Sequence, residues 1–456
     1  MLEDATRPAA IVQGLEKELR GELIYPQDSR YEAARKVWNG RINKYPAVIV
    51  RCAESADLVC ALQFARHHHL PVAVRNGGHS LSGSSVCNGG MVIDLSQMKG
   101  TCISPANKTI KVQAGLTLSE FVQATLPYGL TTTTGTVGGT GLAGLTLGGG
   151  LGWLMGKYGL TVDSLLAVDI VTADGQVLRA SATEHPDLFW GVRGGGGNFG
   201  IVTSFQFQPH PVGPLLAGMV VYPMARAREV LRFYREYTSH APDELTCFAI
   251  FATMPDGHAA VAIAPCYSGP LDEGERVIAP LRKFGPPLVD LIRPMSYSDL
   301  TTMIDMTAPD GRCYYDKSST LKGEISDEAI DTLIESASSF TSPFSQILIP
   351  HIHGAACRIA PTATAVAALR DASYLINMIA AWEKDESTQH VGWARTSWEA
   401  MEPYAAGGVY INFLNDEKEE RIRASYGVNY DRLVALKNMY DPTNFFHFNQ
   451  NIKPTM

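Results

Sequence analysis

Short apolar runs of strand length alternate with helical stretches through the first 210 residues. β-branched, apolar runs predict strands at 47–51, 71–75, 91–95, 109–113, 165–172 and 201–207. Amphipathic spacing predicts helices at 12–21, 31–39, 56–69 and 117–127. Ala173-Asp174-Gly175 is a hairpin signal lying between the last two predicted strands. This half is therefore an alternating α and β unit.

Prolines and glycine at 208–216 interrupt the pattern and predict a boundary. Strands and helices alternate again beyond it, at 218–222, 226–239, 246–253, 259–267, 272–283, 325–340 and 346–358. A helix at 429–440 precedes an irregular tail rich in asparagine. Two units are predicted, and composition alone does not assign the tail to either.

Composition narrows the class of protein. The chain has 456 residues, 45% hydrophobic and 18% charged, which predicts a globular protein with a large core. The net charge of -8 argues against nucleic acid as a partner. No apolar run reaches the roughly 18 residues of a membrane span, and the first residues lack the features of a signal peptide. Eight scattered cysteines without a CxxC pair favour reduced thiols, so we expect a cytoplasmic protein.

Glycine clusters at 75–80, 135–152 and 193–200 are the main candidates for ligand binding. Glycine in ordered structure costs backbone entropy, and clusters of it commonly let backbone N–H groups approach phosphate. Three clusters in one half of the chain indicate a long ligand that is touched at several points. Flexible loops are the alternative, disfavoured because the clusters adjoin apolar strands.

The stretch 139–144 also matches GxGxxG, and Asp163 follows about twenty residues later. A dinucleotide-binding Rossmann site needs a hydrophobic strand before the glycines and a regular helix after them. Here four threonines precede the motif, and glycines at 148–150 interrupt the helix. Both requirements fail.

Four segments in order resemble berberine-bridge-enzyme-like flavoproteins of the vanillyl-alcohol-oxidase superfamily. They are PVAVRNGGHSLSGSSVCNGGMVIDLSQM from 71, GLAGLTLGGGLGWLMGKYGLTVDSLLAVDIVTADG from 141, DLFWGVRGGGGNFGIVT from 187, and the closing 440–446 with 449–452. The resemblance implies an α+β, two-domain FAD-binding fold. It assigns 1–210 to an FAD domain of two α+β subdomains and 211–408 to a substrate domain with an antiparallel sheet backed by helices. The segment 409–456 would return to the FAD domain.

The resemblance also implies how FAD is held. His79, in the RxGGH motif, would bond covalently to the flavin 8α-methyl group. The other expected cofactor contacts are Arg75, Asn76, Gly77, Gly78, Ser80, Ser82, Gly83, Thr140, Gly141, Gly144, Leu145, Gly148, Gly149, Gly197, Gly200, Val202, Asn449 and Asn451. Val137 stands where many relatives have a second linking cysteine, which implies a single link. Leu145 stands where the family often has a histidine, so the resemblance implies that one polar contact to the ring is absent from this chain.

Several residues are candidates for the catalytic base. His351 and His353 would share one face of the strand 346–358, and Tyr410 and Asn412 share a face in a Y-x-N that matches a family motif. Tyr314, Tyr315 and Lys317 match a stretch that approaches the substrate in the family. A tyrosine needs a nearby cation to act as a base, and Lys317 could supply it. The base stays undecided among these residues.

The sequence thus predicts an FAD-dependent oxidase that takes hydride from an alcohol or amine carbon of a small secondary metabolite and reduces O2 to H2O2. Oligosaccharide oxidation, a dehydrogenase with another acceptor, oxygenation of a polyketide-like substrate and FAD binding without turnover are the alternatives. A monomer or homodimer is expected. The tract 66–69, with three histidines, is interpreted as the end of a helix and not as a metal site.

Overall fold

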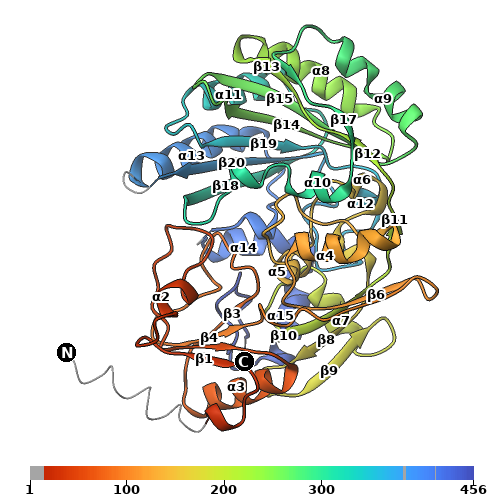
Figure 1. Cartoon of the computed structure of the whole chain (residues 1–456). Helices are drawn as coiled ribbons and strands as arrows, with labels where there is room; N and C mark the ends of the chain where they lie inside the picture. Colours follow the sequence, from red (N-terminus) through yellow and green to blue (C-terminus); the bar gives the residue numbers. More distant parts are fainter. Residues whose placement is uncertain (1–14, 384–386, 416, 456) are drawn as a thin grey trace.

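The computed structural model describes residues 15–383, 387–415 and 417–455. Helices and sheets are mixed, and the chain forms two halves, one above the other in Figure 1. In the lower half, the described residues form a four-stranded sheet in the order β1-β2-β4-β3 (Glu22–Ile24, Val48–Arg51, Met91–Asp94 and Val72–Arg75). β2, β4 and β3 are parallel because helix α3 (Ser55–His67) carries the chain from β2 to β3. The predicted strands at 47–51, 71–75 and 91–95 are confirmed.

The second sheet of the lower half is antiparallel, and its five strands among the described residues have the order β5-β6-β10-β8-β9. Their bounds are Thr101–Ser104, Thr109–Gln113, Ile201–Phe207, Leu165–Val171 and Val177–Ser181. The turn at 173–175 joins β8 to β9, whereas β10 pairs with the other edge of β8. β9 is polar and partly exposed, so the apolar pattern did not reveal it.

Short helices connect and cover these sheets. They are α2 (Tyr31–Ala34), α4 (Leu118–Thr125), α5 (Leu142–Leu147), α6 (Met155–Tyr158) and α7 (Pro186–Val192), with the strand pair β7 (Leu130–Thr131) and β11 (His210–Pro211). α4 begins at a capping box in which Thr117 and Glu120 satisfy each other's backbone N–H groups. The helix predicted at 31–39 is shorter than expected. That predicted at 12–21 starts outside the described residues and continues only as a 3-10 turn at Leu15–Lys17.

The upper half is built on a large antiparallel sheet, nine-stranded within the described residues, with the main order β16-β13-β15-β14-β19-β20-β18; β12 also pairs with β15, and β17 pairs with β12. In chain order, β12 to β20 span Leu215–Ala217, Val220–Pro223, Leu245–Thr253, Ala259–Tyr267, Val289–Asp290, Arg293–Met295, Cys313–Leu321, Gln346–Pro350 and Tyr374–Trp382. Helices α8 (Ala227–Ser239), α9 (Leu271–Lys283), α11 (Asp327–Ser338) and α13 (Ser387–Met401) cover its outer face (Figure 1). The inner face is turned toward the lower half.

The strand predicted at 346–358 is wrong in its second part. β19 ends at Pro350, and the chain passes through Gly354, with φ of +61°, into the short helix α12 (Ala355–Arg358). A left-handed glycine breaks the extended conformation, and the apolar composition of 352–357 concealed that turn. Helix α10 (Tyr297–Thr302) lies between the two halves, where Tyr297 Oη accepts a hydrogen bond from Thr134 N at 2.9 Å.

The C-terminal segment returns to the lower half. After α14 (Glu419–Tyr426) comes α15 (Tyr430–Tyr440), which contacts α7. Lys437 is fully buried and donates to Asp441 Oδ2 at 2.7 Å and to the backbone oxygen of Asn198 at 3.0 Å. Asn198 in turn donates to Gln450 O and accepts from Ile452 N. The tail is therefore tied to the third glycine cluster.

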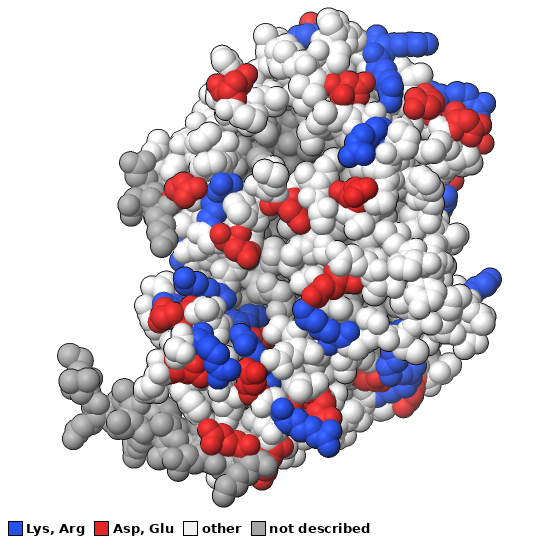
Figure 2. Space-filling model, in the orientation of Figure 1, with Lys and Arg blue, Asp and Glu red and all other residues white. Residues whose placement is uncertain are grey.

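Positive and negative side chains are interspersed on the face shown in Figure 2, with no broad area of one sign. Such a surface offers no basic track for a polyanion. Among the helices of the described residues, none combines the length and the apolar character that a membrane crossing requires.

Candidate active site

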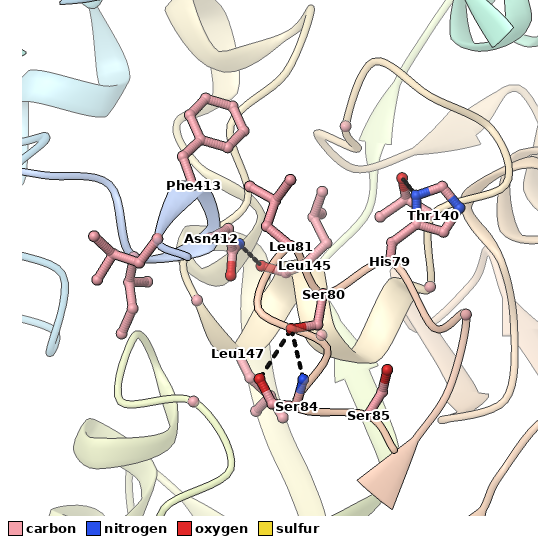
Figure 3. A pocket seen from close by; sticks show the side chains of 18 of the residues that line it. His79, Ser80, Leu81, Ser84, Ser85, Thr140, Leu145, Leu147, Asn412 and Phe413 are labelled. Carbon is pink, nitrogen blue, oxygen red and sulfur yellow. Dashed lines mark hydrogen bonds between the residues drawn. The ribbon is translucent and has the colours of Figure 1, made fainter. Parts of the chain in front are cut away.

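A cavity of about 430 Å³ lies between the two halves and is lined by residues from both. One side, here called the glycine wall, comprises residues 76–80, 135–148 and 196–202. These ranges overlap the three glycine clusters of the lower half. The opposite side, the strand wall, comprises the inward-facing residues of β18, β19 and β20. Figure 3 shows the region where His79, Thr140 and Leu145 meet the C-terminal residues Asn412 and Phe413. Segments far apart in sequence thus converge on one ligand-sized space.

The first loop of the glycine wall is held from behind by Arg75. Its guanidinium donates to Asp94 Oδ2 at 2.7 Å, across the β3–β4 pair in which the two residues are direct partners. Arg75 does not line the cavity, so it supports the loop and does not contact a ligand there. Asn76 Oδ1 accepts from Ala143 N at 3.2 Å, and its amide donates to Leu116 O at 3.3 Å. The first two glycine clusters are therefore joined by a side chain.

Only glycine fits where these clusters meet. A Cβ on Gly141 would lie 2.1 Å from Asn76 Oδ1, and a Cβ on Gly77 would lie 2.4 Å from Gly141 N. Gly144, Gly196 and Gly197 differ, because nothing lies within 4 Å of a Cβ built on them although they line the cavity. Their bare backbone faces open space, which is a cradle for a bound molecule.

His79 lies within this wall and is partly buried. A hydrogen bond of 3.3 Å joins its Nδ1 to Thr140 Oγ1 (Figure 3), and its ring stacks on Trp38 with centroids 4.9 Å apart. Trp38 also stacks on Tyr314 of the strand wall, with ring centroids 3.8 Å apart. Burial lowers the pKa of His79 to about 4. The imidazole is therefore neutral at neutral pH and keeps a nucleophilic lone pair.

The C-terminal tail packs against the third glycine cluster. Asn449 donates to Gly197 O at 3.2 Å, and its Oδ1 is buried without a partner among the described residues. Ser85 Oγ, which also lines the cavity, is another buried atom without such a partner. Polar atoms of this kind are expected where a ligand supplies the missing hydrogen bonds.

β18 in the strand wall has two distinct faces. Tyr314 and Asp316 line the cavity. Tyr315 and Lys317 point to the other side, where Tyr315 Oη accepts from Arg395 Nε of α13 at 3.0 Å and Lys317 pairs with Glu417 at 2.5 Å. The strand alternation that was applied to the histidines also separates these four residues. Tyr315 and Lys317 are therefore not brought to the cavity, and Asp316, which sequence reasoning missed, is.

Tyr410 and Asn412 do reach the cavity and touch each other. Tyr410 Oη accepts from Gly150 N at 3.0 Å, Leu151 N at 3.2 Å and Asn412 Nδ2 at 2.9 Å. Asn412 also donates to Leu145 O at 3.1 Å (Figure 3). Burial raises the pKa of Tyr410 above its ordinary value, and Lys317 is held elsewhere by Glu417. Through these hydrogen bonds, Tyr410 and Asn412 join the C-terminal segment to the second glycine cluster.

His351 and His353 lie outside this cavity. They share a face, as the alternation predicted, with rings stacked at 4.6 Å, and they border a separate, more open pocket with Asp243 and Arg358. His353 bonds Leu245 O at 2.8 Å, and burial lowers the pKa of His351 to about 3. The geometry gives neither histidine access to the space between the walls.

Comparisons with known proteins agree with this architecture. Residues 46–181 match the model of an FAD binding domain, and 409–453 match the berberine and berberine like model. An uncharacterized FAD-linked oxidoreductase of Bacillus subtilis is 32% identical over 96% of this chain and 98% of its own length. This chain belongs to the berberine-bridge-enzyme-like FAD-linked oxidoreductases. The crystal structure of 6-hydroxy-D-nicotine oxidase from Arthrobacter nicotinovorans matches with a TM-score of 0.89 at 28% identity, covering 95% of this chain and 98% of that one.

Two further matches are named as oxidases. (R)-6-hydroxynicotine oxidase of Paenarthrobacter nicotinovorans is 33% identical over 62% of this chain and 63% of its own length. A chitooligosaccharide oxidase shares the fold, with a TM-score of 0.87 at 22% identity over 98% of this chain and all of that one.

The residues present in this oxidoreductase fit FAD, since open glycine backbone, unpartnered polar atoms and a partly buried, neutral histidine line one continuous space. The predicted contacts that line it are Asn76, Gly77, Gly78, His79, Ser80, Thr140, Gly141, Gly144, Leu145, Gly148, Gly197, Gly200, Val202, Asn449, Tyr410 and Asn412. The predicted contacts that do not line this space are Arg75, Ser82, Gly83, Gly149 and Asn451. Trp38, Gln346 and Asn377 join Asp316 as lining residues that the motifs did not reveal.

Proposed function

We propose that this oxidoreductase is an oxidase with FAD linked covalently through His79, acting on an alcohol or amine carbon of a small metabolite. The observation that carries the proposal is the cavity that joins a neutral, partly buried His79 to a separate strand wall where a second molecule can bind. When bound, FAD supplies a two-electron acceptor that dioxygen can regenerate. The substrate loses a hydride from carbon and a proton from oxygen or nitrogen, and O2 becomes H2O2.

A single link is supported by the lining of the cavity. Val137 lines it, and no cysteine is found among the described lining residues. Forming the link makes one N–C bond from the imidazole to the 8α carbon and breaks one C–H and one N–H bond. The two electrons released are passed to O2. Trp38 and Thr140 restrain the imidazole from two sides and thereby orient it for that bond.

Small heterocyclic amines are the first substrates to test, because the nicotine oxidase matches over nearly the whole chain. The strand wall supports this class because its apolar residues Leu348, Ile379 and Ala381 lie among polar groups that can orient a ligand, which are Asp316, Gln346 and Asn377. Oligosaccharides are a second class, supported by the shared fold of the chitooligosaccharide oxidase.

The first experiment is acid precipitation of the purified protein. Flavin retained in the pellet and mapped by peptide mass to the fragment containing His79 is the expected result, and release to the supernatant refutes the link. Peroxide formation is then measured with 6-hydroxy-D-nicotine, related cyclic amines, secondary alcohols and chitooligosaccharides. Flavin that is retained but reduced by none of these compounds refutes the oxidase proposal. Reduction of the flavin without peroxide indicates a dehydrogenase.

A further inference from the structure

Asp316 is the one formally charged side chain among the described residues that line the cavity. The titratable groups that share the lining are His79, Tyr314, Tyr410 and Tyr426. His79 is neutral at neutral pH and the tyrosines are uncharged, because burial lowers the pKa of the first and raises those of the others. On the outer face of the same strand, Lys317 and Glu417 neutralise each other. The carboxyl group therefore has no counter-ion in the cavity.

The hydrogen bonds of Asp316 are incomplete. Asn377 Nδ2 of β20 donates to its Oδ2 at 2.9 Å, while Oδ1 is buried and has no partner within the described part of the chain. Asn377 Oδ1 is unpartnered as well, and the residue as a whole is only 1% exposed. A buried carboxyl oxygen without a donor is costly unless a ligand supplies one. A substrate O–H or N–H is such a donor.

Asp316 lies on the strand wall two residues from Tyr314, which is linked to His79 through Trp38. His79, Trp38 and Tyr314 form a continuous ring stack across the two walls. Tyr314 and Asp316 are two residues apart on one face of β18, which places them roughly 7 Å apart along the strand. Asn39 fixes this register, because its amide bonds both Leu81 O beside the His79 loop and Tyr314 O of the strand, each at 3.0 Å.

Burial also sets the acidity of this group. The apolar surroundings raise the pKa of Asp316 to about 7, and the bond from Asn377 opposes the rise. A carboxyl that titrates near neutrality exchanges protons in the working range of an oxidase.

We propose that Asp316 is the general base that takes the hydroxyl or amine proton of the substrate, and that Asn377 positions its carboxylate. The proposal rests on the proposed function. As the proton leaves oxygen or nitrogen for Asp316, the C–H hydrogen would leave with its electron pair to the two-electron acceptor that bound FAD supplies, and C=O or C=N forms. The protonated carboxyl group of Asp316 then gives its proton to solvent or to the H2O2 that forms from O2.

The test compares wild type with Asp316→Asn, Asp316→Glu and Asn377→Leu, with the exposed Asp256→Asn as the matched control. Each holoenzyme is first assayed for acid-stable flavin and for full reduction by dithionite, so that loss of the cofactor is separated from loss of the base. Anaerobic flavin reduction is then followed from pH 5 to 9 with whichever amine or alcohol reduces the wild type. Infrared difference spectra of wild type minus Asp316→Asn report protonation of the carboxyl without any turnover.

We expect Asp316→Asn to retain flavin and to slow its reduction by substrate about 100-fold or more. Asp316→Glu should recover part of that rate, and Asn377→Leu should move the pH midpoint upward because a stabilising donor is lost. Equal rates and pH profiles in wild type and Asp316→Asn would overturn the proposal. If no compound reduces the flavin of the wild type, the oxidase proposal fails, and the infrared titration of Asp316 alone tests whether its carboxyl group can accept a proton near neutral pH. Titration near pH 7 supports the assignment of a proton-accepting carboxyl, and titration near pH 4 overturns it.

Discussion

The two walls of the cavity are built by different means. The glycine wall uses backbone: its first two loops come close because Gly77 and Gly141 have no side chain, and Asn76 joins them. The strand wall uses alternating side chains of antiparallel strands, and a shift of one residue would replace Asp316 by Lys317. The glycine wall can therefore hold the constant cofactor, whereas the strand wall can vary with the substrate. Each wall also carries a titratable group whose pKa desolvation shifts toward the uncharged form, His79 in the glycine wall and Asp316 in the strand wall.

The largest effect is expected at His79. His79→Ala should reduce acid-stable flavin from near full occupancy to almost none, because the proposed bond has no alternative nucleophile in the lining. Acid precipitation followed by absorbance of pellet and supernatant measures this, with His258→Ala, whose side chain is 85% exposed, as the control. Flavin that remains in the pellet of His79→Ala would place the link elsewhere.

Substitutions at two glycines should distinguish the role of the glycine wall in folding from its role in binding the ligand. Gly141→Ala should destabilise the protein by about 1–3 kcal/mol, because the new Cβ would meet Asn76 Oδ1 at 2.1 Å. Gly144→Ala meets no protein atom within 4 Å and lies in helix α5, so it should leave the stability of the flavin-free protein unchanged or slightly higher. Its methyl group enters the cradle and should lower flavin occupancy. Urea unfolding and flavin content together measure the two effects, and equal losses of stability would contradict the separation.

The strand wall should show its buried acid in the pH dependence of stability. The folded pKa of Asp316, about 7, lies above the unfolded value of roughly 3.9, so the native state holds the extra proton between these limits. Stability from this group is full at pH 4 and is lost as the pH rises to 7. Asp316→Asn should therefore gain up to about 4 kcal/mol over wild type at pH 8 and almost nothing at pH 4. Urea unfolding at both pH values checks this, and a difference independent of pH would contradict it.

The same contrast explains what the sequence could predict. Motif residues of the glycine wall are contiguous, so 76–80 and 140–148 could be located from spacing and resemblance alone. Faces in the strand wall depend on register, and Cys313–Leu321 is buried along its whole length, so hydrophobic alternation could not separate Tyr314 and Asp316 from Tyr315 and Lys317. The rings of His351 and His353 stack on each other, but the strand predicted to carry them ends at Pro350, and both border another pocket. Trp38 lies in a short segment without a motif, and only the tertiary stack reveals it.

The smallest effect is expected at Trp38, where the walls touch. Trp38→Leu removes the stack on His79 and Tyr314 and the bond from Nε1 to Ala308 O, and should cost about 1–3 kcal/mol of stability. Trp38→Phe keeps a ring and should cost less. If Trp38 also orients His79, the leucine variant should carry a larger fraction of loosely bound, acid-released flavin than the phenylalanine variant, although both fold. Equal acid-stable flavin in the two variants would restrict Trp38 to joining the walls, since only an orienting role depends on a ring lying against the imidazole.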